Sequence, residues 1–312
     1  MTLRAAYLFP GQGAQYVGMG KDLYEIYPEA KKTFDTANHI LGFSISDLCF
    51  LGPEKVLTET ANAQTAIFVT SIAGFRVFET HSSQIQPVAA CGLSLGEFSA
   101  LVACGSLTFE DGIGLVRVRS KLMNQAANQH PGTMASILGL GQAECETLCQ
   151  QTGVQIANIN SPEQIVLSGE RDAVLKACGM VQAKGGKVVP LNVSGAFHSR
   201  LMESARDGFQ KTLRSVRLEK PKITFIPNVT GKAASDPEQI RALLHEQLTS
   251  SVQWVKTMAA LVEMKIQKGY EIGPGKVLKG LAKRNRVNFD VLPIETAADI
   301  RQLNQSTEEK VC

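Results

Sequence analysis

Apolar positions in the first hundred residues alternate between short continuous runs and helical spacing. Residues 5–9, Ala-Ala-Tyr-Leu-Phe, form an apolar run that predicts a buried strand. Residues 27–41 and 65–78 carry apolar side chains three and four positions apart, which predicts two helices. Val-Ala-Ala-Cys at 88–91 predicts a second buried strand, and a helical segment follows it at once. Strands that alternate with helices favour an α/β fold with a mainly parallel sheet.

The pattern changes after a long helix expected over residues 109–129, which the sequence His130-Pro131-Gly132 ends. Four short strands and two helices then follow in the order strand, helix, strand, strand, helix, strand. We expect them at 134–140, 142–151, 154–159, 164–168, 171–184 and 187–193. This order is the split βαβ pattern of a ferredoxin-like unit. The sequence therefore predicts a compact inserted subdomain over residues 131–196.

The main domain is expected to resume after the insertion, with strands near 223–227 and 270–272. This assigns residues 1–130 and 197–303 to the core. Residues 304–312 are polar and lack periodicity, which predicts a flexible tail.

Composition narrows the class of protein. The chain has 312 residues, of which 44% are hydrophobic and 20% are charged, as in an ordinary globular protein with a sizeable core. The 32 basic and 29 acidic side chains nearly balance, which disfavours a nucleic-acid-binding protein.

Cysteines and apolar runs indicate the compartment. The seven cysteines are scattered, odd in number and form no Cys-x-x-Cys pair, so a zinc site and a disulfide framework are both disfavoured. Neither a leader segment nor a membrane-spanning apolar run is expected. We therefore expect a cytoplasmic protein with reduced thiols and no membrane contact.

The most informative motif is Gly-Leu-Ser-Leu-Gly at residues 92–96, between the strand at 88–91 and the following helix. A serine at such a strand-to-helix turn projects its hydroxyl from a strained backbone, with the helix N-terminus facing any negative charge on a bound carbonyl. Ser94 is therefore a candidate nucleophile. The alternative is a glycine-rich turn with an incidental serine.

A serine nucleophile needs a base. Of the five histidines, His39 and His245 lie in polar helical segments, while His81 and His130 lie at segment ends. His198 follows a strand where the insertion rejoins the core, a position at which clefts form. It is the candidate base, the alternative being a packed or capping histidine.

Two other observations bear on the site. No acid stands between Ser94 and His198 in a position to orient the imidazole, which suggests a dyad oriented by another group. Arg117 and Arg119 alternate with apolar residues in the helix 109–129, so one of them is a candidate for bidentate binding of a carboxylate. The alternative is a pair of surface arginines.

Five segments taken together resemble the acyltransferases of fatty acid and polyketide synthesis, in particular the malonyl-CoA:acyl carrier protein transacylases. They are Phe-Pro-Gly-Gln-Gly at 9–13, Gly-Leu-Ser-Leu-Gly-Glu at 92–97, Arg119 in its helix, Gly-Ala-Phe-His at 195–198 and Tyr-Glu-Ile-Gly-Pro-Gly at 270–275. The resemblance spans about residues 5–295. It implies an α/β-hydrolase-like core with a mainly parallel sheet and the inserted ferredoxin-like subdomain.

The resemblance implies transfer of a malonyl group from malonyl-CoA to the phosphopantetheine thiol of acyl carrier protein, through an ester on Ser94. His198 would be the general base and acid, oriented by the backbone carbonyl of Gln247. Backbone N–H groups of Gln12 and Leu95 would form the oxyanion hole. Arg119 would bind the malonyl carboxylate. No metal or cofactor is implied, only the coenzyme A thioester as substrate.

One departure from the family pattern concerns the acyl pocket. The family usually has histidine before the nucleophile, beside the bound carboxylate, whereas this chain has Leu93. Phe197, in the Ala-Phe-His sequence, matches the malonyl-selective version of its loop. Both residues are therefore expected to bind substrate.

An acidic carrier needs a basic surface. Basic residues gather near the C-terminal end, where Lys276, Lys279, Lys283 and Arg284 are expected to receive it. The alternative is a solvated helix face. We expect a monomer.

Two other functions stay open on the sequence: a serine hydrolase or thioesterase using the same elbow, and a non-catalytic scaffold. A polyketide carrier is the alternative partner, although a discrete chain favours the fatty acid pathway. Arg119 distinguishes the transacylase from the hydrolase, because a hydrolase does not need an arginine for a dicarboxylic acyl group.

Overall fold

The computed structural model describes residues 3–82 and 84–308 and is built around a five-stranded parallel sheet, ordered β7-β2-β1-β8-β9. The strands of this sheet are β1 (Ala5–Phe9), β2 (Pro87–Gly92), β7 (Thr224–Ile226), β8 (Lys268–Ile272) and β9 (Asp290–Ile294). In β1, Tyr7 and Phe9 contribute to one apolar cluster and Ala6 and Leu8 to another. The sheet is thus buried on both faces, which explains the continuous apolar run of its first strand.

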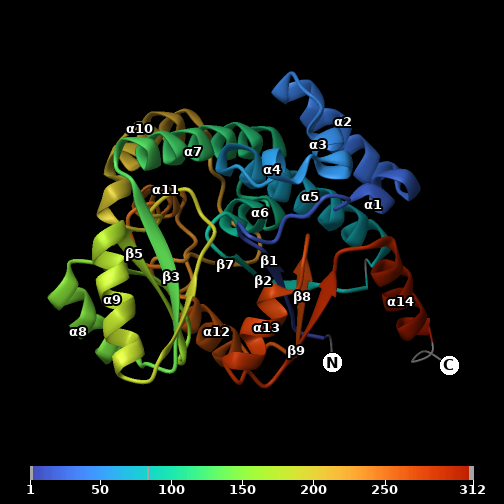
Figure 1. Ribbon diagram of the computed structural model, residues 1–312. Coiled ribbons are helices and arrows are strands. Elements are labelled where there is room, and N and C mark those ends of the chain that lie inside the picture. Colours follow the sequence, from blue (N-terminus) through green and yellow to red (C-terminus); the bar gives the residue numbers. More distant parts are fainter. Residues whose placement is uncertain (1–2, 83, 309–312) are drawn as a thin grey trace.

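Helices surround this sheet (Figure 1). Those of the core are α1 (Lys21–Ile26), α2 (Pro28–Leu41), α3 (Ile45–Leu51), α4 (Glu54–Leu57), α5 (Thr60–His81), α6 (Gly96–Ala103), α7 (Phe109–Gln129), α10 (Glu203–Ser215), α11 (Pro237–Glu246), α12 (Trp254–Glu263), α13 (Val277–Arg284) and α14 (Ala297–Glu308), with a short 3₁₀ turn at Arg200–Met202. None of the described helices combines the length and apolar composition needed to cross a bilayer.

A second, antiparallel sheet forms the inserted unit, drawn in green to yellow at the left of Figure 1. Its order is β4-β5-β3-β6. The unit comprises β3 (Gly132–Leu138), α8 (Gln142–Thr152), β4 (Gln155–Ser161), β5 (Gln164–Glu170), α9 (Arg171–Ala183) and β6 (Lys187–Pro190). All six predicted elements are present in the predicted order. The fold prediction is confirmed, whereas the domain boundaries at 131 and 196 stay a prediction.

The inserted sheet is fastened to the core through the segment that follows α11. Asn158 of β4 forms a parallel bridge with Val252. Ile159 N donates to Val252 O at 2.9 Å, and Val252 N donates to Ala157 O at 2.8 Å. The same segment carries Gln247, so the insertion supports a residue of the candidate site.

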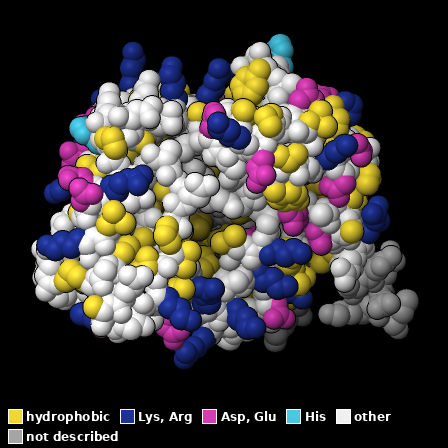
Figure 2. All heavy atoms as spheres, viewed as in Figure 1, with side chains coloured by type: hydrophobic (Ala, Val, Ile, Leu, Met, Phe, Trp, Pro, Cys, Tyr) yellow, Lys and Arg dark blue, Asp and Glu magenta, His cyan; other side chains and the backbone are white. Residues whose placement is uncertain are grey.

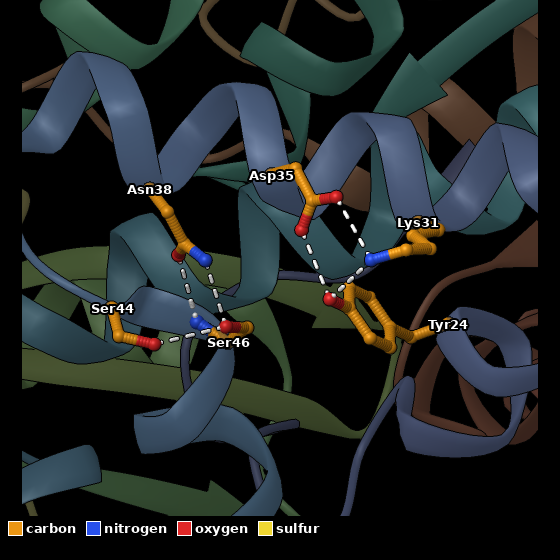
Figure 3. Close-up of polar contacts among 6 residues, drawn as sticks. All are labelled: Tyr24, Lys31, Asp35, Asn38, Ser44 and Ser46. Atoms are coloured by element: carbon orange, nitrogen blue, oxygen red, sulfur yellow. Dashed lines mark hydrogen bonds and ion pairs between the residues drawn. The ribbon is translucent and has the colours of Figure 1, made fainter.

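Polar contacts, some exposed and some partly buried, fasten the first helices to one another (Figure 3). The Tyr24 hydroxyl of α1 donates to Asp35 Oδ1 of α2 at 3.0 Å, and Lys31 Nζ donates to Asp35 Oδ2 at 3.0 Å. Asn38 of α2 exchanges two hydrogen bonds with Ser46 of α3, at 2.8 and 3.1 Å. We name the first group, Tyr24, Lys31 and Asp35, the surface cluster.

One expectation needs correction, and some elements were not predicted. Helix α14 continues to Glu308, so the first part of the predicted flexible tail, residues 304–308, is helical. Residues 309–312 lie outside the described residues. Strand β9 and several helices, among them α3, α4, α10, α12 and α14, were not predicted; α3 and α4 are too short for their positions to define a period.

Candidate active site

Ser94 lies at the turn between β2 and α6 with a backbone φ of +51°, a conformation that non-glycine residues rarely adopt. Glycines on either side make this turn possible. A β-carbon on Gly92 would collide with the backbone of Gly96, and one on Gly96 would collide with the carbonyl of Phe9. The strained backbone is the feature expected of a nucleophile elbow.

His198 is hydrogen-bonded to Ser94. Its Nε2 lies 2.8 Å from Ser94 Oγ, and its Nδ1 lies 2.8 Å from the backbone oxygen of Gln247. Because the carbonyl of Gln247 can only accept, the proton lies on Nδ1, and Nε2 is free to accept the serine proton. Burial, and then the charge of Arg119, lower the pKa of His198 from 6.5 to about 4, which keeps the imidazole neutral.

Arg119 points from α7 to the same hydroxyl. Its Nη2 donates to Ser94 Oγ at 3.0 Å and to Gln247 Oε1 at 2.9 Å, and its Nη1 donates to Gln64 Oε1 at 2.6 Å. The side chain is 1% exposed, and burial lowers its pKa to about 10. Arg117, two positions earlier, is exposed and donates to Leu41 O. Of the two candidate arginines, the fold therefore brings Arg119 into the site.

The guanidinium has an unusual set of partners for a buried cation. All three acceptors are neutral, and Nε is buried without a hydrogen-bond partner among the described residues. Buried charges are normally paired with an opposite charge. The site thus holds a cation that is oriented but, within the part of the chain that the structure describes, has no directly paired anion.

Two buried residues to which the sequence assigned no role hold the elbow. Asn228 accepts from Ser94 N at 2.6 Å and donates its amide to Gly92 O at 2.6 Å. Glu97 accepts from Asn228 N at 2.7 Å and from the side-chain amide of Gln247. Both lie more than 100 positions from a principal partner, so the sequence did not indicate their contacts, although Glu97 ends the Gly-Leu-Ser-Leu-Gly-Glu segment.

The loop that contains Gln12 packs against the elbow, since a β-carbon on Gly11 would collide with the carbonyl of Leu93. The Gln12 amide donates to Thr60 Oγ1 at 3.2 Å, and its carbonyl oxygen lies 3.4 Å from Gln64 Nε2. Thr60 and Gln64 of the α5 region, which the sequence did not single out, therefore position this loop.

The remaining predicted residues are less closely tied to the hydroxyl. Leu95 is buried at the start of α6, and Phe197 is buried within the larger apolar cluster. Leu93 is half-buried and packs against the apolar cluster that contains Trp254. The contribution of Leu93 and Phe197 to an acyl pocket stays a prediction.

A hollow opens on the face shown in Figure 2, with hydrophobic side chains inside it and Lys and Arg side chains beside it. Four of the basic residues in and next to α13 are exposed: Lys276, Lys279, Lys283 and Arg284. Nη2 of Arg286 lies 3.5 Å from Oε1 of Glu163.

Among the described residues, no group of three His, Cys, Asp or Glu side chains could hold a metal ion.

A serine–histidine dyad on a strand-to-helix elbow, beside a buried arginine that has no paired anion among the described residues, defines a class of acyl-transferring enzymes. Residues 6–301 match the acyl transferase domain family, and the chain belongs to this family.

Within it, the chain belongs with the malonyl CoA-acyl carrier protein transacylases. It is 39% identical to the one of Bacillus subtilis strain 168, with 98% of each chain covered, and 37% identical to the one of Escherichia coli K12, with 89% of this chain and 92% of that one covered.

Solved structures agree. The transacylase of Coxiella burnetii superposes with a TM-score of 0.94 at 34% identity, covering 98% of both chains. A malonyl-transacylase solved in complex with a type II polyketide acyl-carrier protein superposes with a TM-score of 0.93 at 34% identity, covering 97% of this chain and 99% of that one. The predicted family is confirmed.

Proposed function

We propose that this protein transfers the malonyl group of malonyl-CoA to the phosphopantetheine thiol of acyl carrier protein, through an ester on Ser94. The observation that carries the proposal is Arg119, a buried cation aimed at the nucleophile and without a directly paired anion. An acyl group with a free carboxylate supplies that anion. The names of the relatives support the same substrate and acceptor.

In the first half-reaction, neutral His198 accepts the Ser94 proton at Nε2 while Ser94 Oγ attacks the thioester carbon. The negative charge that develops on the carbonyl oxygen lies against the backbone N–H groups of Leu95 and Gln12. When the tetrahedral intermediate collapses, His198 returns its proton to the sulfur of coenzyme A. The products are malonyl-Ser94 and free coenzyme A.

In the second half-reaction, the carrier thiol occupies the place of coenzyme A. His198 removes its proton, the thiolate attacks the ester, and the proton returns to Ser94 Oγ. The carbonyl of Gln247 keeps the imidazole in one tautomer throughout. Each step moves only protons and an acyl group, so the proposed reaction requires neither a metal nor a cofactor.

Substrate selection is assigned to Arg119. Its free Nε and the edge of its guanidinium offer charged donors to the malonyl carboxylate. Leu93 and Phe197 are proposed to form the apolar part of the acyl pocket. A hydrolase with the same dyad needs no such cation for an uncharged acyl group, so Arg119 favours the transacylase.

The carrier is proposed to dock on the exposed basic surface of α13, formed by Lys276, Lys279, Lys283 and Arg284. These side chains are exposed, and no carboxylate lies within ion-pair distance of them among the described residues. Unpaired surface cations attract an acidic partner and speed its association. The proposal includes a fatty acid carrier as acceptor, a cytoplasmic location and a monomer.

Intact-protein mass spectrometry tests the proposed function. Wild-type protein and Ser94→Ala are mixed with malonyl-CoA, and then with holo carrier protein. We expect a malonyl adduct on the wild type alone, which carrier discharges and water clears slowly. An adduct that water clears as fast as carrier does would establish a hydrolase, and comparing fatty acid with polyketide carriers identifies the preferred acceptor.

A further inference from the structure

Glu97 is a buried carboxylate close to the site that the proposed reaction does not use. It lies in the first turn of α6 and is 1% exposed. One of its oxygens accepts from Asn228 N at 2.7 Å, and the other accepts from the side-chain amide of Gln247. Two N–H donors therefore meet the two oxygens, the arrangement that the ionised form requires.

The Gln247 side chain lies between Glu97 and Arg119. Its Nε2 donates to Glu97 and also to Ser94 O at 2.9 Å, while its Oε1 accepts from Arg119 Nη2 at 2.9 Å. A carboxylate can only accept hydrogen bonds, so Glu97 determines that the NH₂ group of this amide faces it. The carbonyl oxygen then necessarily faces the guanidinium. A reversed amide would place its donors against the donors of Arg119.

The electrostatic interaction between Glu97 and Arg119 also links these two residues. Burial raises the pKa of Glu97 to about 8, whereas its two N–H donors and the Arg119 charge oppose that rise. In turn, Glu97 opposes the decrease that burial causes in the pKa of Arg119. The other titratable groups near this pair are the Cys91 thiol, whose pKa burial and Glu97 raise, and the neutral His198. In its ionised form Glu97 is thus a nearby counter-charge that itself takes none of the N–H donors of Arg119, whose Nε has no hydrogen-bond partner among the described residues.

We propose that Glu97 is a positioning residue: through the Gln247 amide it orients Arg119 and keeps the guanidinium available for an acyl carboxylate. The inference rests on the proposed function and deepens it, because it assigns part of the selection of charged acyl groups to a residue that touches neither Ser94 Oγ nor the guanidinium.

The test compares acylation of Ser94 by malonyl-CoA and by acetyl-CoA, which lacks the carboxylate, in the full-length Glu97→Gln variant. An amide at position 97 offers a donor as well as an acceptor, so the orientation of Gln247 is no longer fixed. We expect the second-order rate of malonyl acylation to fall about 10- to 100-fold. Acetyl acylation should change less than about threefold.

Glu271→Gln is the matched control. Glu271 of β8 is also a fully buried carboxylate, and it accepts from Leu278 N at 2.8 Å and Lys279 N at 2.7 Å. Its partners belong to α13 and not to Ser94 or Arg119. We expect this variant to keep the wild-type ratio of malonyl to acetyl acylation.

A double-mutant cycle with Arg119→Ala decides whether Glu97 acts through the guanidinium. Adding Glu97→Gln to Arg119→Ala should leave malonyl acylation unchanged. Two results would overturn the inference. One is that Glu97→Gln lowers malonyl and acetyl acylation equally. The other is that Glu97→Gln lowers malonyl acylation by the same factor in Arg119→Ala as in wild type. If Glu97→Gln does not fold, as judged by its melting curve, Gln247→Met removes the connecting amide and must show the same selective loss.

Wild-type protein separates this inference from the function on which it rests. A wild type that shows no malonyl preference would overturn both proposals. A wild type that prefers malonyl, together with a Glu97→Gln variant of unchanged ratio, would overturn only the role of Glu97.

Discussion

Lys31 and Arg119 are two hydrogen-bonded cations of this protein with opposite surroundings. In the surface cluster, Lys31 donates directly to the carboxylate of Asp35 at 3.0 Å, as Figure 3 shows. In the site, Arg119 donates to two glutamine carbonyls and a serine hydroxyl, and its nearby carboxylate, Glu97, is separated from it by the Gln247 amide.

The difference shows what burial makes possible. Water weakens the Lys31–Asp35 pair, so its direct contact contributes little. Inside the protein the effective dielectric is lower and a direct ion pair would hold Arg119 to its partner. Neutral acceptors instead orient the guanidinium and leave its charge available to a ligand.

The difference between the two cations should disappear if Arg119 is given a carboxylate as a direct partner. Gln64→Glu places a carboxylate where Gln64 Oε1 now accepts from Arg119 Nη1. Because this carboxylate competes with that of the substrate, we expect malonyl acylation of Ser94 to fall about 100-fold. Acetyl acylation, followed by mass spectrometry in the same way, should change less than about threefold.

Gln64→Leu is the control for this substitution, since it removes the hydrogen bond without adding charge. It should lose less malonyl activity than Gln64→Glu. A larger loss in the leucine variant would mean that packing, and not charge, explains the effect.

The same burial makes a prediction about pH. The pKa of His198 is lowered from 6.5 to about 4, so the base stays neutral down to about pH 4. Inactivation of Ser94 by a sulfonyl fluoride, which reports the dyad alone, should keep nearly its full rate from pH 7 to pH 5. A histidine of ordinary pKa would lose about tenfold at pH 5.5.

The free energy of unfolding should also depend on pH through His198. A depressed folded-state pKa contributes stability that is present above pH 6.5 and is lost as the pH falls from 6.5 to about 4. Denaturant unfolding of wild type and His198→Gln over this range measures the contribution. In the sulfonyl fluoride experiment, an inactivation rate that falls to half near pH 6.5 would contradict the buried, neutral histidine.

The exposed cations of α13, which have no ion-pair partner among the described residues, should have a smaller effect, on the binding of carrier protein. Reversing Lys283 and Arg284 of α13 to glutamate should raise the KM for carrier protein about 3- to 10-fold and leave the KM for malonyl-CoA nearly unchanged. Raised salt should reduce the difference from wild type, because exposed charges are screened. Equal changes in both KM values would remove α13 as the docking surface.

The surface cluster itself gives the smallest expected effect. Asp35→Asn removes the partner of an exposed lysine, so we expect no measurable change in melting temperature or in either acylation rate. A clear loss of acylation in this variant would show that α2 influences the site, which the comparison excludes.

Much of the architecture could be predicted because its signals are local. The buried run at β1, the long helix α7 and the six elements of the insertion each carry a period or a turn signal within a few residues. Ser94 was found from its elbow motif and His198 from its place after the insertion. The alternation around Arg117 and Arg119 limited the choice to two arginines but could not decide between them.

The network behind these residues could not be predicted, because its contacts join distant segments. Glu97 has the ordinary appearance of an acidic residue in the first turn of a helix. Asn228 belongs to an Asn-Val-Thr triplet, and its link to Ser94 crosses 134 positions. Gln64 directly precedes the predicted helix 65–78 and carries no motif. Only the folded arrangement of the sheet brings these amides and this carboxylate together.

Competition between malonyl-CoA and acetyl-CoA for Ser94, in wild type and Arg119→Ala, tests the central claim most directly. Mass spectrometry of the mixture reports both adducts at once, so any general effect on the nucleophile cancels in their ratio. The account predicts a strong malonyl preference in wild type that collapses or reverses in Arg119→Ala. A variant that keeps the wild-type preference would contradict the claim that Arg119 is held charged in order to bind the acyl carboxylate.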